Sequence, residues 1–402
     1  MQRLPFSRRA TPLASALPVA APAAAIAFDS GHASPSVLPD LTTVAARALT
    51  EHRNETLQYA PRPGLPELRQ WIAAYMTADG CATKADEILV TNGAKHAIDL
   101  ICRLLLDEGD SIVVTVPTYF TAIPIFKSFG VSFIEIGQDH EGLDVAELSL
   151  VLTRLTSEGR AVPKLIYNVP DFHNPTGISM SVERRRALVE LAKRYGISII
   201  EDSPYRKVRF EGESVPPLKA LDSDGLVFLV GTFSKLMAPG LRVGWIAAQP
   251  ALIARLVQLK SDGGSCPLTQ RMIVDFCAGS GLDAHTSRVQ STYRAHRDRM
   301  VSAMRRELPQ ASFEVPAGGY YLWLELPPTT DGDDVARRAR DAGVIVLAGS
   351  KFFAPGDAAH PKNFIRVAFS HATADEIDEG VRRLAAAYAA ATASATAMAG
   401  VR

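Results

Sequence analysis

The sequence predicts an α/β fold in which a large domain with a mostly parallel central sheet is followed by a smaller α+β domain. Short apolar runs alternate with helix-length amphipathic segments through about residue 280. Several of these runs are continuously apolar, as expected of strands that helices cover on both faces. From about Arg294 the alternation ends, and a charged helix is followed by three short apolar runs. We therefore predict an N-terminal arm and substrate-side loop over residues 1–45, a large domain over 46–285 and a small domain over 286–402.

Turn and cap residues delimit the elements of the large domain. A helix is expected over 66–76, and a strand over 88–91 leads through the tight turn Asn92-Gly93 into another helix. The helix over 181–196 should end at Gly196, which can adopt the left-handed conformation of a helix C-cap. Further strands are expected over 111–120, 131–137, 164–170, 197–205, 226–235 and 242–248.

In the small domain the charged helix YRAHRDRMVSAMRREL precedes the runs GGYYLWLEL, VIVLAGSKFF and FIRVAFS. Thr373 is placed as the N-cap of a final helix, TADEIDEGVRRLAAAY.

Bulk composition excludes several functional classes. Lys plus Arg and Asp plus Glu both total 43, so no broad field favours nucleic acid or an anionic membrane. The chain has no apolar run near the roughly 20 residues of a transmembrane helix. The cysteines form no C-x-x-C pair, which argues against a zinc site or a disulfide framework and for a reducing, cytoplasmic location, with no metal expected; they are Cys81, Cys102, Cys266 and Cys277.

The N-terminus leaves one question of location open. Arg8-Arg9 precede an Ala/Pro-rich segment in the manner of a twin-arginine export signal. Prolines at 12, 18 and 22 interrupt its apolar part, which favours a loosely docked arm instead.

Polar and aromatic residues gather where the expected strands end, which is where open α/β sheets bind ligands. Asn92-Gly93 also starts a helix whose first backbone N–H groups, at Ala94 and Lys95, could hold a phosphate. The other members of this set are Tyr119, Asn174, Asp202, Tyr205, Thr232, Ser234, Lys235 and Arg242.

Each of these signals alone has an ordinary interpretation. Asn-Pro-Thr-Gly is usually a plain turn, an acidic strand end is usually a cap, and a lysine after hydroxyls is usually exposed. Together they suit one ligand that is planar, aromatic, phosphorylated and carbonyl-bearing. That ligand is pyridoxal phosphate, which proteins hold through a lysine Schiff base and a carboxylate partner for the ring nitrogen.

The chain resembles the fold-type I, class I/II aminotransferases that depend on pyridoxal phosphate. The resemblance is strongest to the branch of 2-aminoadipate and kynurenine aminotransferases, and the catalytic domains of MocR-type regulators are similar too. It covers about 57–385 and rests on stretches that stay in order: LQYAPRPGLPELRQWIA, ILVTNGAKHAIDL, VPTYF, YNVPDFHNPTGISMSVERRRALVELA, IIEDSPYRKVRFEG, VGTFSKLMAPGLRVGW, GGYYLWLELP and FIRVAFS.

The resemblance implies a role for each cofactor residue. Lys235 corresponds to the Schiff-base lysine that also moves the substrate proton, and Asp202 to the partner of the pyridine nitrogen. Asn174 and Tyr205 correspond to ligands of the ring oxygen, and Tyr119 to the residue that stacks on the ring. The implied phosphate ligands are Thr232, Ser234, Arg242 and the backbone of Ala94 and Lys95.

The resemblance also implies substrate contacts and a partner. Tyr59 corresponds to a tyrosine that reaches the phosphate of the partner subunit, which implies a homodimer with composite sites. Arg366 corresponds to the arginine that binds the substrate α-carboxylate in a bidentate manner, and Asn168 to a pocket residue near that carboxylate.

Two departures from the family pattern affect the site. Gly93-Ala94-Lys95 stands where the family usually has Gly-Ser-Gln, so a hydroxyl is missing, and Lys95 either replaces its bond by charge or points to solvent. The loop FDSGHASPSVLPD has a single Gly31 followed by His32, where the branch usually has a Gly-Gly loop. His32 either contacts the substrate or is an exposed loop histidine.

An aminotransferase acting on an L-α-amino acid and a 2-oxo acid such as 2-oxoglutarate is the leading function. Elimination or replacement, decarboxylation and oxidation on the same cofactor remain the alternative, because a loop such as 28–40 decides which bond of the substrate reacts. A non-enzymatic effector-binding domain is disfavoured, because 1–45 is too short and too rich in Pro and Ala for a DNA-binding domain. Tyr320, Tyr321 and Phe352 favour an aromatic or aliphatic substrate, which the sequence does not name.

Overall fold

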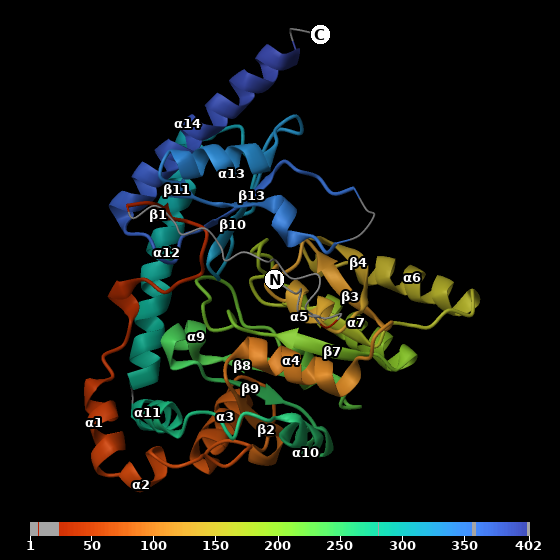
Figure 1. Ribbon diagram of the computed structural model, residues 1–402, viewed down its shortest axis with the longest axis vertical. Coiled ribbons are helices and arrows are strands. Elements are labelled where there is room, and N and C mark those ends of the chain that lie inside the picture. The colour runs from red at the N-terminus through yellow and green to blue at the C-terminus, as the bar shows by residue number, and fades with distance from the viewer. Residues whose placement is uncertain (1–6, 8–23, 280, 356–358, 400–402) are drawn as a thin grey trace, which may run out of the picture.

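The computed structural model describes residues 7, 24–279, 281–355 and 359–399 (Figure 1). The Arg8-Arg9 segment lies outside the described residues. In the part of the chain that is described, no helix combines the length and the apolar character needed to cross a bilayer.

An eight-stranded sheet forms the centre of the large domain, in the order β2-β9-β8-β7-β6-β3-β4-β5. Neighbours from β8 through β7, β6 and β3 to β4 are parallel, whereas β9 is antiparallel to β2 and β8, and β5 to β4. The prediction of a mostly parallel sheet is therefore confirmed. The strands are β2 (Ile88–Thr91), β3 (Ser111–Val116), β4 (Ser132–Asp139), β5 (Gly142–Leu143), β6 (Leu165–Asn168), β7 (Ser198–Asp202), β8 (Val227–Thr232) and β9 (Gly244–Ala247).

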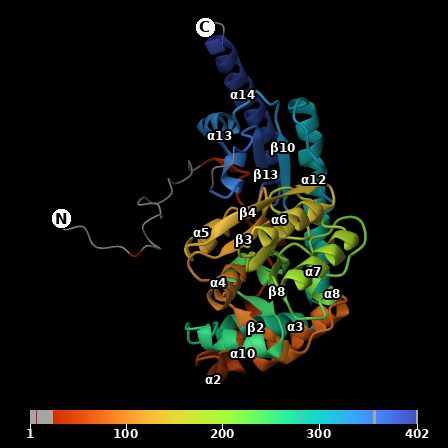
Figure 2. The ribbon, with the colours of Figure 1, turned by 90° about the vertical axis from the view of Figure 1, so that its right-hand side faces the viewer.

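Helices cover both faces of this sheet, which is why its strands are apolar throughout. Because side chains alternate along a strand, Ile112 and Val114 pack in one core with α4 (Ala94–Leu105), and Val113 packs in another with α6 (Val145–Ser157). Figure 2 shows α4 and α5 on one side of the strands and α7 on the other. The remaining helices of this domain are α1 (Thr42–Thr50), α2 (Arg53–Thr56), α3 (Pro66–Ala78), α5 (Ile123–Lys127), α7 (Val182–Tyr195), α8 (Leu218–Leu221), α9 (Phe233–Leu236), α10 (Pro250–Leu259) and α11 (Pro267–Ala278).

Several strands end earlier than the sequence predicts, and the reason is local. β3 stops at Val116 because Pro117 has no N–H for the ladder. β8 stops at Thr232, whose side chain caps the short helix α9 by accepting a hydrogen bond from the Ser234 N–H. The expected strand over 197–205 ends at Asp202. Asp202 and Thr232 are thus the last residues of adjacent strands.

Both predicted helix caps are present. Gly196 ends α7 in the left-handed conformation, with a φ of 67°. The start of α7 has a cap that the sequence analysis did not name, because Ser181 accepts from the Arg184 N–H. Thr373 exchanges hydrogen bonds with Glu376 at the start of α14 (Ala374–Ala399).

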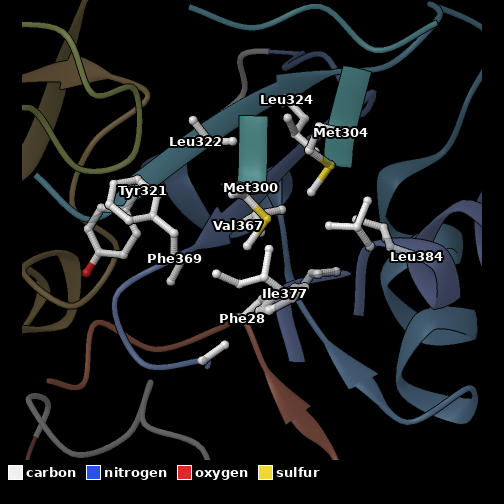
Figure 3. Packing of buried hydrophobic residues seen from close by; sticks show 14 of the residues in the cluster. Phe28, Met300, Met304, Tyr321, Leu322, Leu324, Val367, Phe369, Ile377 and Leu384 are labelled. Atoms are coloured by element: carbon white, nitrogen blue, oxygen red, sulfur yellow. The ribbon is translucent and has the colours of Figure 1, made fainter. Parts of the chain in front are cut away.

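The small domain packs an antiparallel sheet, β10-β13-β12, against long helices. Met300 and Met304 of α12 and Ile377 of α14 meet Leu322 and Val367 of the sheet in one apolar core (Figure 3). Its elements are α12 (Gly281–Glu307), β10 (Tyr321–Glu325), α13 (Gly332–Asp341), β11 (Val344–Ile345), β12 (Leu347–Ala348), β13 (Phe364–Ala368) and α14. Single 3₁₀ turns occupy Pro35–Val37, Ala85–Glu87, Pro239–Leu241 and Gly349–Phe352.

Two elements cross the domain boundaries that the sequence predicts. The strand β1 (Ile26–Ala27) pairs in parallel with β11, and Phe28 is fully buried in the core of the small domain. Helix α12 runs through the predicted boundary at 285 and contacts both α11 and α14 (Figure 1). The boundaries stay a prediction.

Candidate active site

A cavity of about 220 Å³ is lined by residues that follow the carboxyl ends of β6, β7 and β8, together with the start of α4. Every predicted cofactor residue except Tyr59 is in its wall: Ala94, Lys95, Tyr119, Asn174, Asp202, Tyr205, Thr232, Ser234, Lys235 and Arg242. The wall also contains Ile98, Val169 and Pro204, which the sequence did not single out, and Pro239 of the Pro-Gly turn that the sequence predicts before Arg242.

Hydroxyl groups and a guanidinium converge at one end of the cavity. The Thr232 hydroxyl lies 3.0 Å from the Ser234 hydroxyl oxygen and is held by the Val243 carbonyl at 3.3 Å. After the turn at 239–241, Arg242 adopts a left-handed φ of 53°, and its guanidinium donates to the Asn92 carbonyl at 3.3 Å. Gly93 permits this approach, because a Cβ at its position would lie 2.9 Å from Arg242 Nη2. The turn therefore brings Arg242 to the N-terminus of α4.

Lys235, in α9, is also part of the cavity wall. Its amine donates to the Gly31 carbonyl at 2.5 Å, from a segment 204 residues away. Burial, with the charges of Arg366 and Arg242, lowers the pKa of this amine to about 8. The neutral amine that a base or nucleophile requires is therefore far more populated near neutral pH than that of an ordinary lysine.

Asp202 provides a buried carboxylate in the cavity wall. Its Oδ2 accepts from the Tyr167 hydroxyl at 2.7 Å, whereas its Oδ1 has no hydrogen-bond partner among the described residues. Burial raises the pKa of Asp202 to about 6, and the Tyr167 hydrogen bond opposes that rise. A buried acceptor without a partner is costly, so this oxygen suits a ligand that brings an N–H donor.

Asn174 connects the cavity to a buried arginine. Its Oδ1 accepts from Arg366 Nη1 at 3.0 Å, and its Nδ2 has no partner among the described residues. Arg366 lies on β13, is 1% exposed and also donates from Nη2 to the Asp29 carbonyl. Its guanidinium carbon lies 4.1 Å from the ring centroid of Tyr321 and 5.2 Å from that of Phe352. No carboxylate in the described part of the chain forms an ion pair with Arg366, so its charge is free for an anionic ligand.

Three other predicted residues lie outside the cavity wall. Tyr59 is 84% exposed. Asn168 is buried at the end of β6, with its amide 3.3 Å from Met180 Sδ. His32 is exposed, and its ring meets the edge of His371 with centroids 5.9 Å apart. The roles implied for these residues stay predictions.

The structure adds two groups to the site that the sequence did not indicate, the Tyr167 hydroxyl and the Gly31 carbonyl. It also places the hydroxyl of Tyr321, which the sequence indicated only as part of the substrate pocket, 3.1 Å from that of Tyr205. The contact between Tyr167 and Asp202 could be inferred once the pairing of their two strands is known. It is paired with Ile200 in the adjacent strand, so its same-face diagonal neighbour is Asp202. A backbone carbonyl such as that of Gly31 leaves no such signal.

Comparison with known proteins identifies the family. The sequence model described as aminotransferase class I and II matches residues 25–384. The chain belongs to the class I and II aminotransferases. The predicted family and enzyme class are thereby confirmed, and so is the α/β fold.

The relatives agree with this assignment. Aromatic-amino-acid aminotransferase 1 of Thermococcus litoralis is 36% identical over 90% of this chain and 87% of its own length. The kynurenine aminotransferase of Pyrococcus horikoshii, solved in complex with PMP, KYN and KYA, has a TM-score of 0.87 and 32% identity over 91% of both chains. The α-aminoadipate aminotransferase of Thermus thermophilus, complexed with N-(5'-phosphopyridoxyl)-L-leucine, has a TM-score of 0.85 and 30% identity over 92% of this chain and 94% of its own.

Pyridoxal phosphate is the cofactor of this enzyme, as the sequence predicts. The cavity suits it on the evidence of the residues themselves: its wall holds a carboxylate oxygen and an amide nitrogen that have no hydrogen-bond partner in the described part of the chain, and a lysine amine of lowered pKa. The enzyme acts on an amino acid and an oxo acid.

Proposed function

We propose that this aminotransferase moves the amino group of an aromatic or aliphatic L-α-amino acid to a 2-oxo acid such as 2-oxoglutarate, with the cofactor held in the cavity between Asp202 and Arg242. The observation that carries the proposal is the set of charged and polar groups that share one cavity wall. A free carboxylate oxygen, a lysine amine and a cationic end with hydroxyl groups match the ring nitrogen, the carbonyl and the phosphate of pyridoxal phosphate.

When bound, pyridoxal phosphate supplies an electron sink for negative charge at the substrate α-carbon. Asp202 would keep the ring nitrogen protonated through its free Oδ1, because a nearby carboxylate stabilises a cationic N–H. Lys235 would bind the carbonyl carbon of the cofactor. Once released, its amine would take a proton from the substrate α-carbon and return it two atoms away, in a 1,3-proton transfer. Its lowered pKa leaves the neutral, proton-accepting amine populated near neutral pH.

The other cavity residues would orient the cofactor. Asn174, through its unpaired amide nitrogen, and Tyr205, through its hydroxyl, would donate to the ring oxygen, and Tyr119 would stack on the ring. The phosphate would be held by Thr232, Ser234, Arg242 and the backbone N–H groups of Ala94 and Lys95.

Arg366 would bind the substrate α-carboxylate. It is buried, lacks an ion-pair partner among the described residues and is joined to the cavity by Asn174. The rings of Tyr321, Phe352 and Phe120 surround its guanidinium, with the centroid of Phe120 at 5.7 Å. These apolar rings support an aromatic or aliphatic substrate side chain, and Asn168 and His32 are the further substrate contacts that the family resemblance implies.

The proposed enzyme is a cytoplasmic homodimer with composite sites. Tyr59 would reach the phosphate in the partner subunit, and its 84% exposure supports a role outside its own chain, since Leu57 beside it is also 61% exposed. A sedimentation experiment on wild-type protein and the Y59F variant tests this: we expect a dimer in both and weaker cofactor binding in the variant. A monomeric wild-type enzyme with full activity would contradict it.

A screen of amino donors with purified enzyme and 2-oxoglutarate tests the reaction. We expect glutamate to form with aromatic or aliphatic donors, in a 1:1 ratio to the oxo acid derived from the donor. Ammonia or hydrogen peroxide formed without any added oxo acid would instead support elimination or oxidation on the same cofactor.

A further inference from the structure

Lys95 is a second cation at the phosphate end of the cavity. It is the second residue of α4, is exposed to solvent, and lines the mouth of the cavity together with Arg242 and Ser234. Among the described residues its amine has neither a hydrogen bond nor an ion pair, and Arg242 donates only to the carbonyls of Asn92 and Pro239. Two cations therefore share one end of a cavity without a carboxylate to balance either of them.

The helix start adds to this positive charge. α4 has no side-chain cap, because Gly93 precedes it and Ala94 is its first residue. The unpaired N–H groups of such a start carry about half a positive charge. Asp262 lies nearby, but Lys260 at 2.8 Å and Asn92 at 2.7 Å already engage its carboxylate.

The two cations also act on each other. Partial desolvation of its amine, and then the charge of Arg242, lower the pKa of Lys95. Placing like charges together costs free energy that a bound dianion removes, and a phosphate ester carries between about −1.5 and −2 charges near neutral pH.

We propose that the ammonium group of Lys95 is a side-chain ligand of the cofactor phosphate and replaces the hydroxyl that Ala94 cannot supply. The inference rests on the proposed function, since it takes this end of the cavity as the phosphate site. It gives that site two charged side-chain ligands, Arg242 and Lys95, and leaves the ring contacts to other residues.

Titration of the apoprotein with pyridoxal phosphate and with phosphate-free pyridoxal tests the inference. For Lys95→Gln we expect the Kd for pyridoxal phosphate to rise about tenfold, as for the loss of one partly exposed charged hydrogen bond, with that for pyridoxal unchanged. Lys164→Gln is the matched control: it removes the same charge from an exposed lysine just before β6, at the opposite end of that strand, and should change neither Kd. Adding Ala94→Ser to Lys95→Gln should restore part of the lost affinity.

The outcomes separate this inference from the proposal on which it rests. If wild-type protein binds the cofactor and K95Q binds both aldehydes as tightly as wild type, only the role of Lys95 is overturned. Equal weakening for both aldehydes also overturns it, because the effect would then not involve the phosphate. If the wild-type protein does not bind pyridoxal phosphate in the cavity, both proposals fail.

Discussion

Replacing Asp202 with asparagine should make the apoprotein more stable and the enzyme inactive. The carboxylate is buried, one of its oxygens has no partner among the described residues, and its pKa is raised from 3.8 to about 6. A difference of about two pH units corresponds to roughly 3 kcal/mol, the cost of keeping this side chain ionised in the folded protein. Asparagine removes that cost and can still accept from the Tyr167 hydroxyl.

The direction of this pKa shift determines how the stability difference between the two proteins changes with pH. Because the pKa is raised on folding, the cost is absent below 3.8, grows as the pH rises towards 6 and is complete above it. Urea unfolding of the cofactor-free proteins at equal concentration should show D202N more stable by up to about 3 kcal/mol at pH 8 and by about half of that at pH 5. Activity with cofactor added should fall by about 100-fold or more, because a neutral amide does not hold the ring nitrogen protonated.

Glu201 provides the contrasting control. Burial raises the pKa of this carboxylate too, but both of its oxygens accept from N–H groups, those of Leu218 and Lys219, both at 2.9 Å. Glu201→Gln places an amide NH₂ against one of these donors and should destabilise the protein at pH 8. A D202N apoprotein that is less stable than wild type at pH 8, or a gain that is the same at both pH values, would refute the reasoning.

Three further substitutions test single contacts. Tyr167→Phe removes the hydrogen bond that lowers the pKa of Asp202, so the acidic limb of the pH–rate profile should move to higher pH; an unchanged limb would show that this carboxylate does not set it. Gly31→Ala places a Cβ 2.2 Å from the Tyr321 hydroxyl oxygen and 3.3 Å from Lys235 Nζ, so kcat should fall about tenfold or more. The control, Gly240→Ala, places a Cβ with no atom within 4 Å and should leave kcat unchanged. Equal rates for the two variants would contradict the close packing at Gly31. Arg366→Lys loses the bidentate geometry, so KM for the amino donor should rise by about 10- to 100-fold while the absorbance of the bound cofactor stays unchanged. Loss of the cofactor absorbance would instead indicate that Arg366 binds the cofactor and not the substrate carboxylate.

Residues at strand ends were predictable because chain order alone places them together. Asp202 and Thr232 end adjacent parallel strands, and strands of one direction bring their carboxyl ends to one edge. The position of Arg242 at this edge was predictable too, because the turn-forming Pro239-Gly240 pair returns the chain towards the same edge.

Contacts made by the backbone of a distant segment were not predictable. The carbonyl of Asp29 accepts from Arg366 and that of Gly31 from Lys235, and any residue type carries such a carbonyl. The position of that segment is fixed by the pairing of β1 with β11 and the burial of Phe28, which depend on the packing of the whole small domain. Tyr59 depends on a second chain, so its role stays a prediction.

Mapping the site of cofactor attachment tests the central claim most directly. The holoenzyme is reduced with borohydride and digested, and the peptide that carries the pyridoxyl group is identified by mass spectrometry. We expect the label on Lys235, with loss of the long-wave absorbance band on reduction and no such band in Lys235→Ala. Label on another lysine, such as Lys95 in the same cavity wall, or a reducible band that persists in K235A, would contradict the account.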